Sequence, residues 1–318
     1  MTKFVSRRGS LGIAIEATRF TPISPTYWLP WAVMSFMDGI EGARQDEGLG
    51  NIADSDAFFV TFKKGEGSID SQLFDQALGY IMSSLLGAKP VTSGGNPYTH
   101  TFTLAQTNQP VTLSLYWKDP DRSYMFAGAT VDSLKMTIAN NAIVAFTVGF
   151  KSKTAKDWAI QTPNYTTLGS KFLQQHLQFR LATNIAGLAG ASETSLKNLE
   201  LTINRNTEFD QNLGTVEPTD ILAQELSVTG TLQLNLNDDT FRNLMLANTY
   251  QAAEIKLFNG ANSSLQLQFP RLDFSEWQPD FNLKQIAQQK INFKGNYDAA
   301  NALDIISTAV LINTKVSY

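Results

Sequence analysis

The chain has 318 residues, of which 43% are hydrophobic, so it can form one large or two ordinary domains with a substantial core. Cysteine is absent, which excludes disulfides, thiolate metal sites and a cysteine nucleophile. The formal net charge of −4 argues against a protein that holds nucleic acid through its phosphates. No apolar run reaches the ~18 residues of a membrane-spanning helix, and Glu16 interrupts the N-terminal apolar residues, so no signal peptide is expected.

The first third of the chain alternates strand patterns with one acidic, glycine-rich stretch. Strands are predicted over Ser10–Ala17, Tyr27–Met37, Ala57–Phe62, Glu66–Asp70, Thr99–Leu104 and Val111–Trp117. Asp38–Asp56 has no periodicity, and a structureless stretch of this length is usually functional or disordered. Apolar residues recur three and four apart over Ser71–Leu86 and predict a helix, which Asp70 or Ser71 can cap and Gly87 can end.

The clearest strand pair in the sequence is Thr130–Phe150. Its residues alternate between apolar and small or polar types on both sides of Asn140 and Asn141. Period-two spacing places each set on one side of a pleated strand, and asparagine tolerates the left-handed backbone of a tight turn. The pattern predicts a β-hairpin with one apolar face.

The second half repeats the order of the first after a linker at Lys151–Ser170. Gly67 and Gly230 are 163 residues apart, whereas the closing hairpins are offset by about 143. The repeat predicts two domains, 1–160 and 161–318; the alternative is two unrelated β-rich domains with similar short strands. The second half is expected to contain a helix at Asp238–Ala247 capped by Asn237 and a second acidic loop at Asn206–Glu225. Its expected strands are His176–Leu181, Leu196–Asn204, Leu226–Leu236, Ile255–Phe258, Leu265–Phe269 and Ile286–Tyr297.

Side chains for catalysis or metal binding are scarce. The two histidines, His100 and His176, both lie in predicted strands, where packing is the more frequent role. The sequence lacks the phosphate-binding loop and the Gly-x-Ser-x-Gly motif. We therefore expect no enzyme activity, cofactor or metal. A small basic cluster at Lys151, Lys153 and Lys156 favours a solvated linker over nucleic-acid binding.

Three stretches resemble the major tail tube proteins of long-tailed, siphovirus-type bacteriophages. They are GSLGIAIEATRFTPISPTYWLPW, GSIDSQLFDQALGYIMSSLLG, and HTFTL followed by GATVDSLKMTIANNAIVAFTVGF. The resemblance covers the first half, and the repeat extends it to the second. It implies a mostly β fold with one short helix per repeat, arranged as two tandem tail-tube-like β-sandwich or half-barrel domains.

The resemblance also implies a structural virion protein of the viral tail, assembled in the host cytoplasm. Such subunits form stacked rings around a lumen through which genomic DNA passes without specific binding. Two domains per chain suggest trimer rings with pseudo-six-fold symmetry, because single-domain members assemble six to a ring. The further partners implied are tape-measure, tail-terminator and tail-tip proteins.

The two acidic loops occupy the place of the loop that reaches the adjacent ring in this family. We expect both to be mobile in the free subunit and ordered on the next ring. The ring-to-ring candidates are Asp46, Glu47, Leu49, Ile52, Asp54, Asp56, Glu208, Asp210, Leu213, Val216, Glu217 and Asp220. The basic counterparts expected on a neighbour are Lys151, Lys153, Lys156, Lys284, Lys290 and Lys294.

A second function remains open at this point, namely a carbohydrate- or receptor-binding β-sandwich of a tail tip or adhesin. Aromatic side chains could stack on sugar rings, although core packing is the usual role of aromatics in strands. The candidates are Tyr27, Trp28, Trp31, Tyr116, Trp117, Trp158 and Trp277.

Overall fold

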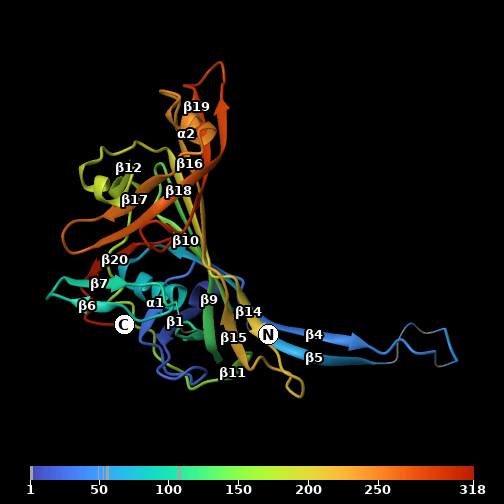
Figure 1. The fold of residues 1–318 in the computed structure, drawn as a ribbon. Helices are drawn as coiled ribbons and strands as arrows, with labels where there is room; N and C mark the ends of the chain where they lie inside the picture. Colours follow the sequence, from blue (N-terminus) through green and yellow to red (C-terminus); the bar gives the residue numbers. More distant parts are fainter. Residues whose placement is uncertain (1–2, 49, 53, 55–56, 107–108) are drawn as a thin grey trace.

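The computed structural model describes residues 3–48, 50–52, 54, 57–106 and 109–318, which form a mostly β structure, as predicted (Figure 1). The strands are β1 (Ser10–Ile15), β2 (Tyr27–Leu29), β3 (Val33–Met34), β4 (Met37–Arg44), β5 (Phe58–Gln72), β6 (Val91–Ser93), β7 (Tyr98–Phe102), β8 (Leu113–Lys118), β9 (Ser123–Ala139), β10 (Ala145–Ser152), β11 (Ala155–Asp157), β12 (Leu177–Ala182), β13 (Asn198–Asn204), β14 (Thr207–Asp210), β15 (Asp220–Ala223), β16 (Ser227–Asn235), β17 (Gln251–Phe258), β18 (Ser264–Asp280), β19 (Gln288–Gly295) and β20 (Thr308–Asn313). The helices are α1 (Asp75–Leu86) and α2 (Thr240–Leu246), with short 3-10 helices at Ser6–Arg8, Gln174–His176 and Ile185–Gly190.

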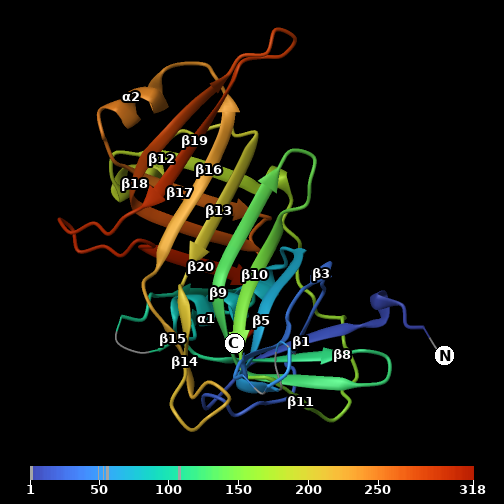
Figure 2. The same ribbon diagram turned by 90° about the vertical axis from the view of Figure 1, so that its right-hand side faces the viewer.

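One antiparallel layer runs through both halves of the chain, and Figure 2 shows its strands side by side. Its order is β3–β5–β10–β9–β13–β16–β19–β18, and β4 continues beyond β3 along β5. The halves join where β9 pairs with β13, from Ala139 opposite Asn198 to Ser133 opposite Asn204. We call this layer the inner sheet and the β9–β13 pairing the intrachain seam.

A second layer is built from the remaining long pairings. In the first half its order is β2–β1–β8–β9–β11, and in the second it is β12–β17–β18–β20. The β20 strand then pairs with β7 and β7 with β6, which makes a second junction between the halves. Because β9 and β18 each have 17 residues, they reach both layers.

The same pairings occur in both halves, residue for residue. Gly67 faces Phe150 across β5 and β10, and Gly230 faces Phe293 across β16 and β19. These positions differ by 163 (230 − 67) and 143 (293 − 150), and those two offsets hold along the full paired stretches of these strands. The β9–β10 and β18–β19 hairpins also shift register at equivalent positions.

The glycines themselves explain part of this likeness. A Cβ on Gly67 would lie 2.5 Å from the Ser35 carbonyl oxygen, and a Cβ on Gly230 would lie 2.4 Å from the Glu200 carbonyl oxygen. In both halves the neighbouring strand therefore approaches closely enough to require a glycine.

The core lies between the layers, and α1 is enclosed in it. All twelve residues of α1 are buried, including its serines. The side that a free amphipathic helix would show to solvent is covered by the C-terminus, where Tyr318 packs edge-on against Tyr80 at 5.2 Å between ring centroids. The sequence predicted burial of the apolar stripe alone, whereas segments distant in the sequence also cover the polar side of the helix.

Several predicted boundaries were wrong for reasons that the pairings show. The α1 helix begins at Asp75 rather than Ser71, because residues through Gln72 pair with β10; Phe74 is its N-cap, without a side-chain cap. Its end at Gly87 is confirmed, with φ of 104° and an N–H bonded to the Ser83 carbonyl. Asn141 has φ of 59°, as expected for the hairpin turn. In the second half, α2 follows Asp239 instead of Asn237.

Candidate assembly interface

The most prominent surface feature is an arm formed by β4 and β5, which projects from the body of the molecule in Figure 1. The prediction of a structureless stretch over Asp38–Asp56 was wrong for its first part, since Asp38 through Arg44 pair with β5. Lys64 bridges Glu41 at 2.8 Å and Glu66 at 3.1 Å, and its hydrogen bond to Glu41 raises the lysine pKa. Backbone pairing, which does not depend on the alternation of side chains, orders this segment.

The arm carries exposed apolar side chains on both strands. They are Met37, Ile40, Phe58, Phe59 and Val60. A projecting hairpin with this much uncovered apolar surface has the character of an interaction site. Four of these five residues lie outside Asp38–Asp56, so the acidic stretch alone did not indicate the whole arm.

The predicted ring-to-ring residues of the first loop lie at or next to the tip of the arm. Asp46, Glu47, Ile52 and Asp54 are all exposed, and the Glu47 carboxylate accepts a hydrogen bond from the Gln45 amide at 2.8 Å. Leu49 and Asp56 lie outside the described residues. The apolar member, Ile52, is completely exposed in the single chain.

The second acidic segment, Asn206–Glu225, is also more ordered than predicted. It contains the β14–β15 hairpin, and this hairpin is held against the first half of the same chain. Asp132 accepts hydrogen bonds from the backbone and hydroxyl of Thr207 at 2.8 and 2.6 Å, and Arg19 forms an ion pair with Asp220. The expectation of a free, mobile loop is not supported for a segment with these ties.

Individual candidates in this segment have mixed environments. Glu208 accepts from Gln224 and Asp210 from Thr219, while the Glu217 carboxylate is bonded to Thr154 of the first half. Leu213 and Val216 remain exposed at the hairpin tip.

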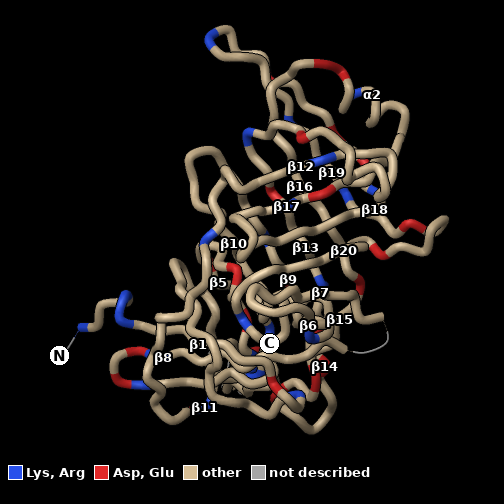
Figure 3. The backbone as a smooth tube through the Cα atoms, turned by 90° about the vertical axis from the view of Figure 1, so that its left-hand side faces the viewer, with Lys and Arg blue, Asp and Glu red and all other residues tan. Residues whose placement is uncertain are grey.

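The basic candidates divide into engaged and exposed residues. Lys151 lies 3.5 Å from Asp132, donates to the Thr207 carbonyl and lies over the Phe209 ring, so it holds the second hairpin. Lys153 lies 4.4 Å from the centre of the Phe20 ring. The remaining four are exposed, namely Lys156, Lys284, Lys290 and Lys294. Figure 3 shows basic and acidic residues intermixed along the chain.

The histidines are packing residues in the geometry observed. His100 is fully buried in β7; its Nδ1 lies 2.9 Å from the Thr92 hydroxyl, and its Nε2 lies 2.9 Å from the Lys315 carbonyl oxygen. Burial lowers the pKa of His100. His176 lies in a short 3-10 helix rather than a strand, and its Nδ1 accepts from the Leu173 N–H.

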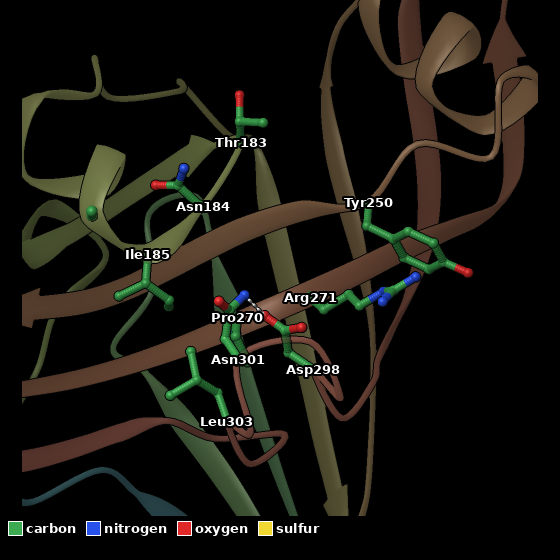
Figure 4. Close-up of a pocket in the computed structure, with 10 residues that line it drawn as sticks. Thr183, Asn184, Ile185, Tyr250, Pro270, Arg271, Asp298, Asn301 and Leu303 are labelled. Atoms are coloured by element: carbon green, nitrogen blue, oxygen red, sulfur yellow. Dashed lines mark hydrogen bonds between the residues drawn. The ribbon is translucent and has the colours of Figure 1, made fainter.

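A cavity of about 590 Å³ lies in the second half beside β17 and β18 (Figure 4). Arg271 stacks on Tyr250 at 3.6 Å, and the Asp298 carboxylate is bonded to the Asn301 amide at 2.7 Å. Its polar groups stabilise one another and show no nucleophile paired with a base. Over the described part of the chain, no cluster of metal-ligating side chains occurs.

The aromatic residues proposed as sugar-stacking platforms are not free for that role. Tyr27, Trp28 and Tyr116 are buried, and the other four are partly covered. The partly covered rings pack against the hydrophobic core. The described helices include none that is long and apolar enough to cross a membrane.

Comparison with known proteins identifies the family of the chain. The chain has no match among curated proteins. A family model described as phage tail tube protein matches residues 6–297, which is nearly the whole chain. This protein therefore belongs to the phage tail tube protein family, and is a structural component of a virion tail.

Proposed function

We propose that the chain associates with copies of itself into rings that stack into a tube, the conduit for DNA ejection. The observation that carries this proposal is the inner sheet, in which two halves with the same pairings lie side by side through the intrachain seam. Repetition of such a joint from chain to chain closes a ring and removes exposed strand edges. Catalysis has no place in this function.

We infer that the two halves are duplicated tube domains, approximately 1–160 and 161–318. Equal register across β5–β10 and β16–β19 supports this division. The linker stays attached to the first half after residue 160, since the N–H of Phe172 bonds the Leu73 carbonyl at 3.1 Å. Two domains per chain make a trimer ring with pseudo-six-fold symmetry.

We assign the polar face of the inner sheet to the lumen. One row of cross-strand neighbours on this face contains two acids, two lysines and three threonines: Asp70, Thr147, Lys135, Thr202, Thr229, Lys294 and Asp273. The charges in this row cancel, and a wall without net positive charge lets a polyanion slide without adhering. Genomic DNA would pass without specific binding.

The arm is the proposed ring-to-ring joint, and its exposed apolar residues supply most of the contact, since exposed ion pairs contribute little singly. The exposed Lys156 and Lys284 are proposed counterparts, whereas Lys290 and Lys294 lie on the polar face that we assign to the lumen. Tape-measure, tail-terminator and tail-tip proteins are proposed partners at the tube ends, and assembly takes place in the host cytoplasm.

Electron microscopy of the purified chain tests the ring, and a deletion tests the joint. We expect rings of three chains that stack into tubes; six full-length chains per ring would refute the duplicated-domain reasoning, and persistent monomers would refute the tube. Deleting Glu47–Ile52 should leave a folded chain that forms rings without elongating. Normal tubes from the deletion variant would show that the joint lies elsewhere.

A further inference from the structure

The two outer edges of the inner sheet have no strand partner among the described residues. One edge is formed by β3 and the beginning of β4, over residues 33–39, and pairs with β5 on its other side. The opposite edge is the C-terminal part of β18 and the residues that follow, 276–282, of which 276–280 pair with β19. We call these the first edge and the second edge.

The chain contains an internal template for how these edges meet. The first edge pairs with β5 as β13 pairs with β16: Val33 faces Asp70, and Asn198 faces Gln233. With the offset of 163 between β5 and β16, residues of β13 correspond to first-edge residues plus 165 (198 − 33). The second edge corresponds to β9 with an offset of 143, since Leu134 faces Val148 and Trp277 faces Ile291.

Both strands of the intrachain seam therefore have an equivalent at an outer edge. The seam places Leu201 opposite Met136 and Leu199 opposite Ile138. Subtracting 165 from the β13 residues gives their first-edge equivalents, and adding 143 to the β9 residues gives their second-edge equivalents. Phe36 then lies opposite Pro279, and Met34 lies opposite Phe281. The same arithmetic places Asp38 opposite Trp277.

Backbone directions on the first edge agree with this register. The Ser35 N–H bonds the Ser68 carbonyl at 2.9 Å, so Ser35 points its backbone groups toward β5. Because successive residues of an antiparallel strand alternate in direction, Met34, Phe36 and Asp38 point theirs away from the sheet.

The second edge shows the matching alternation. The Leu236 N–H bonds the Ala287 carbonyl, so the backbone N–H and C=O groups of Ala287, and by alternation those of Gln289 and Ile291, point toward β16. Gln288, Lys290 and Asn292 then point toward β18, where their partners are Asp280, Gln278 and Glu276. The residues between these partners, Trp277 and Pro279, direct their backbone outward, as the register requires.

Side-chain burial distinguishes the two kinds of edge. At the intrachain seam Ile138 and Leu199 are 4% and 1% exposed. At the outer edges the equivalent of Ile138, Phe281, is 72% exposed, and the equivalent of Leu199, Met34, is half-buried. The apolar positions that the intrachain seam buries at Ile138 and Leu199 are therefore uncovered or only partly covered at the outer edges, which indicates a partner of the same shape.

We propose that the first edge of one chain pairs antiparallel with the second edge of another copy, in the register Met34–Phe281, Phe36–Pro279 and Asp38–Trp277. This proposal rests on the ring assembly proposed above and specifies its joint. The two seams differ in chemistry: the intrachain seam has a Lys135–Glu200 ion pair at 3.1 Å, where the interchain seam places Gln278 and Ser35. Pro279 also lacks the N–H that Met136 supplies, so Phe36 accepts no bond there.

Engineered disulfides test the register directly, because the natural chain has no cysteine. Ser35 and Asp280 form a non-hydrogen-bonded pair in the proposed seam, with Cα atoms about 4.5 Å apart, within disulfide range. The variant Ser35→Cys/Asp280→Cys should give covalent oligomers, ending at the closed ring, on a non-reducing gel after oxidation of the assembled protein. Met37→Cys/Gln278→Cys is a second pair in register.

The control Ser35→Cys/Glu276→Cys is shifted by four residues, about 13 Å, on the same face and should remain largely monomeric. Stronger cross-linking of this control, or no cross-linking of either in-register pair in rings seen by microscopy, would overturn the register and leave the tube intact. If wild-type protein formed no rings, the proposed function would fail and the seam with it.

Discussion

The burial of α1 gives a prediction with a calculable size. Ile81 is 1% exposed and packs in the core between the layers. Its replacement by Ala removes three carbon groups, worth about 0.8 kcal/mol each in transfer free energy. Because α1 is enclosed on every side, the cavity should collapse poorly, so the total should reach about 3–4 kcal/mol, within the range of about 2–5 for such changes.

The assay is urea unfolding of Ile81→Ala beside Leu246→Ala, a change on the exposed side of α2. The control should change the free energy of unfolding by less than about 0.5 kcal/mol. Ile81→Asp should be insoluble, since it would bury an unpaired charge at a cost of several kcal/mol. A soluble Ile81→Asp variant, or an Ile81→Ala midpoint equal to wild type, would show that α1 faces solvent and would refute the burial argument.

Three other variants probe the sheet and its buried polar groups. Gly230→Ala should destabilise by more than about 2 kcal/mol, because its Cβ would lie 2.4 Å from the Glu200 carbonyl oxygen, whereas Gly190→Ala has open space; equal melting of the two would contradict this. Glu16→Ala should cost about 3 kcal/mol by urea unfolding, because it leaves four donors, including the Gly128 N–H, without their acceptor. The folded-state pKa of His100 is lowered, so the unfolded chain binds more protons and stability should fall as pH drops below about 6.5. His100→Gln should show a smaller loss between pH 7.5 and 5, and an unchanged loss would assign it to other groups.

Local sequence patterns predicted those elements whose pairing or capping partners are close in the sequence. The β9–β10 hairpin follows from alternation on both sides of Asn140 and Asn141, and its turn needs no distant partner. The α1 stop at Gly87 is equally local. The β4 strand was missed because Gly39, Gly42 and its acids do not alternate with apolar residues, and only pairing with β5 orders it.

The acidic stretch led to residues that are exposed on the arm, such as Glu47 and Ile52, and their contact with the next ring stays a prediction. The docking of β14 and β15 depends on Arg19 and Asp132, which lie 201 and 75 residues from their partners. No periodicity within Asn206–Glu225 contains that information, so the hairpin was predicted as a free loop.

The proposed duplication has a consequence for when the proposed ring closes. One seam of each chain forms within the chain and buries aliphatic residues such as Leu201 and Met136. The interchain seam that we propose forms only with a second copy, and until then its edges are exposed to unwanted pairing. Pro279 removes a backbone donor from the second edge, a common protection of edge strands. A slipped partner would meet the same missing donor without burying Phe281 against Met34, so the proline weakens every register and the apolar contact favours the proposed one. The edge is therefore suited to staying unpaired until a second copy of the chain presents Val33–Gly39.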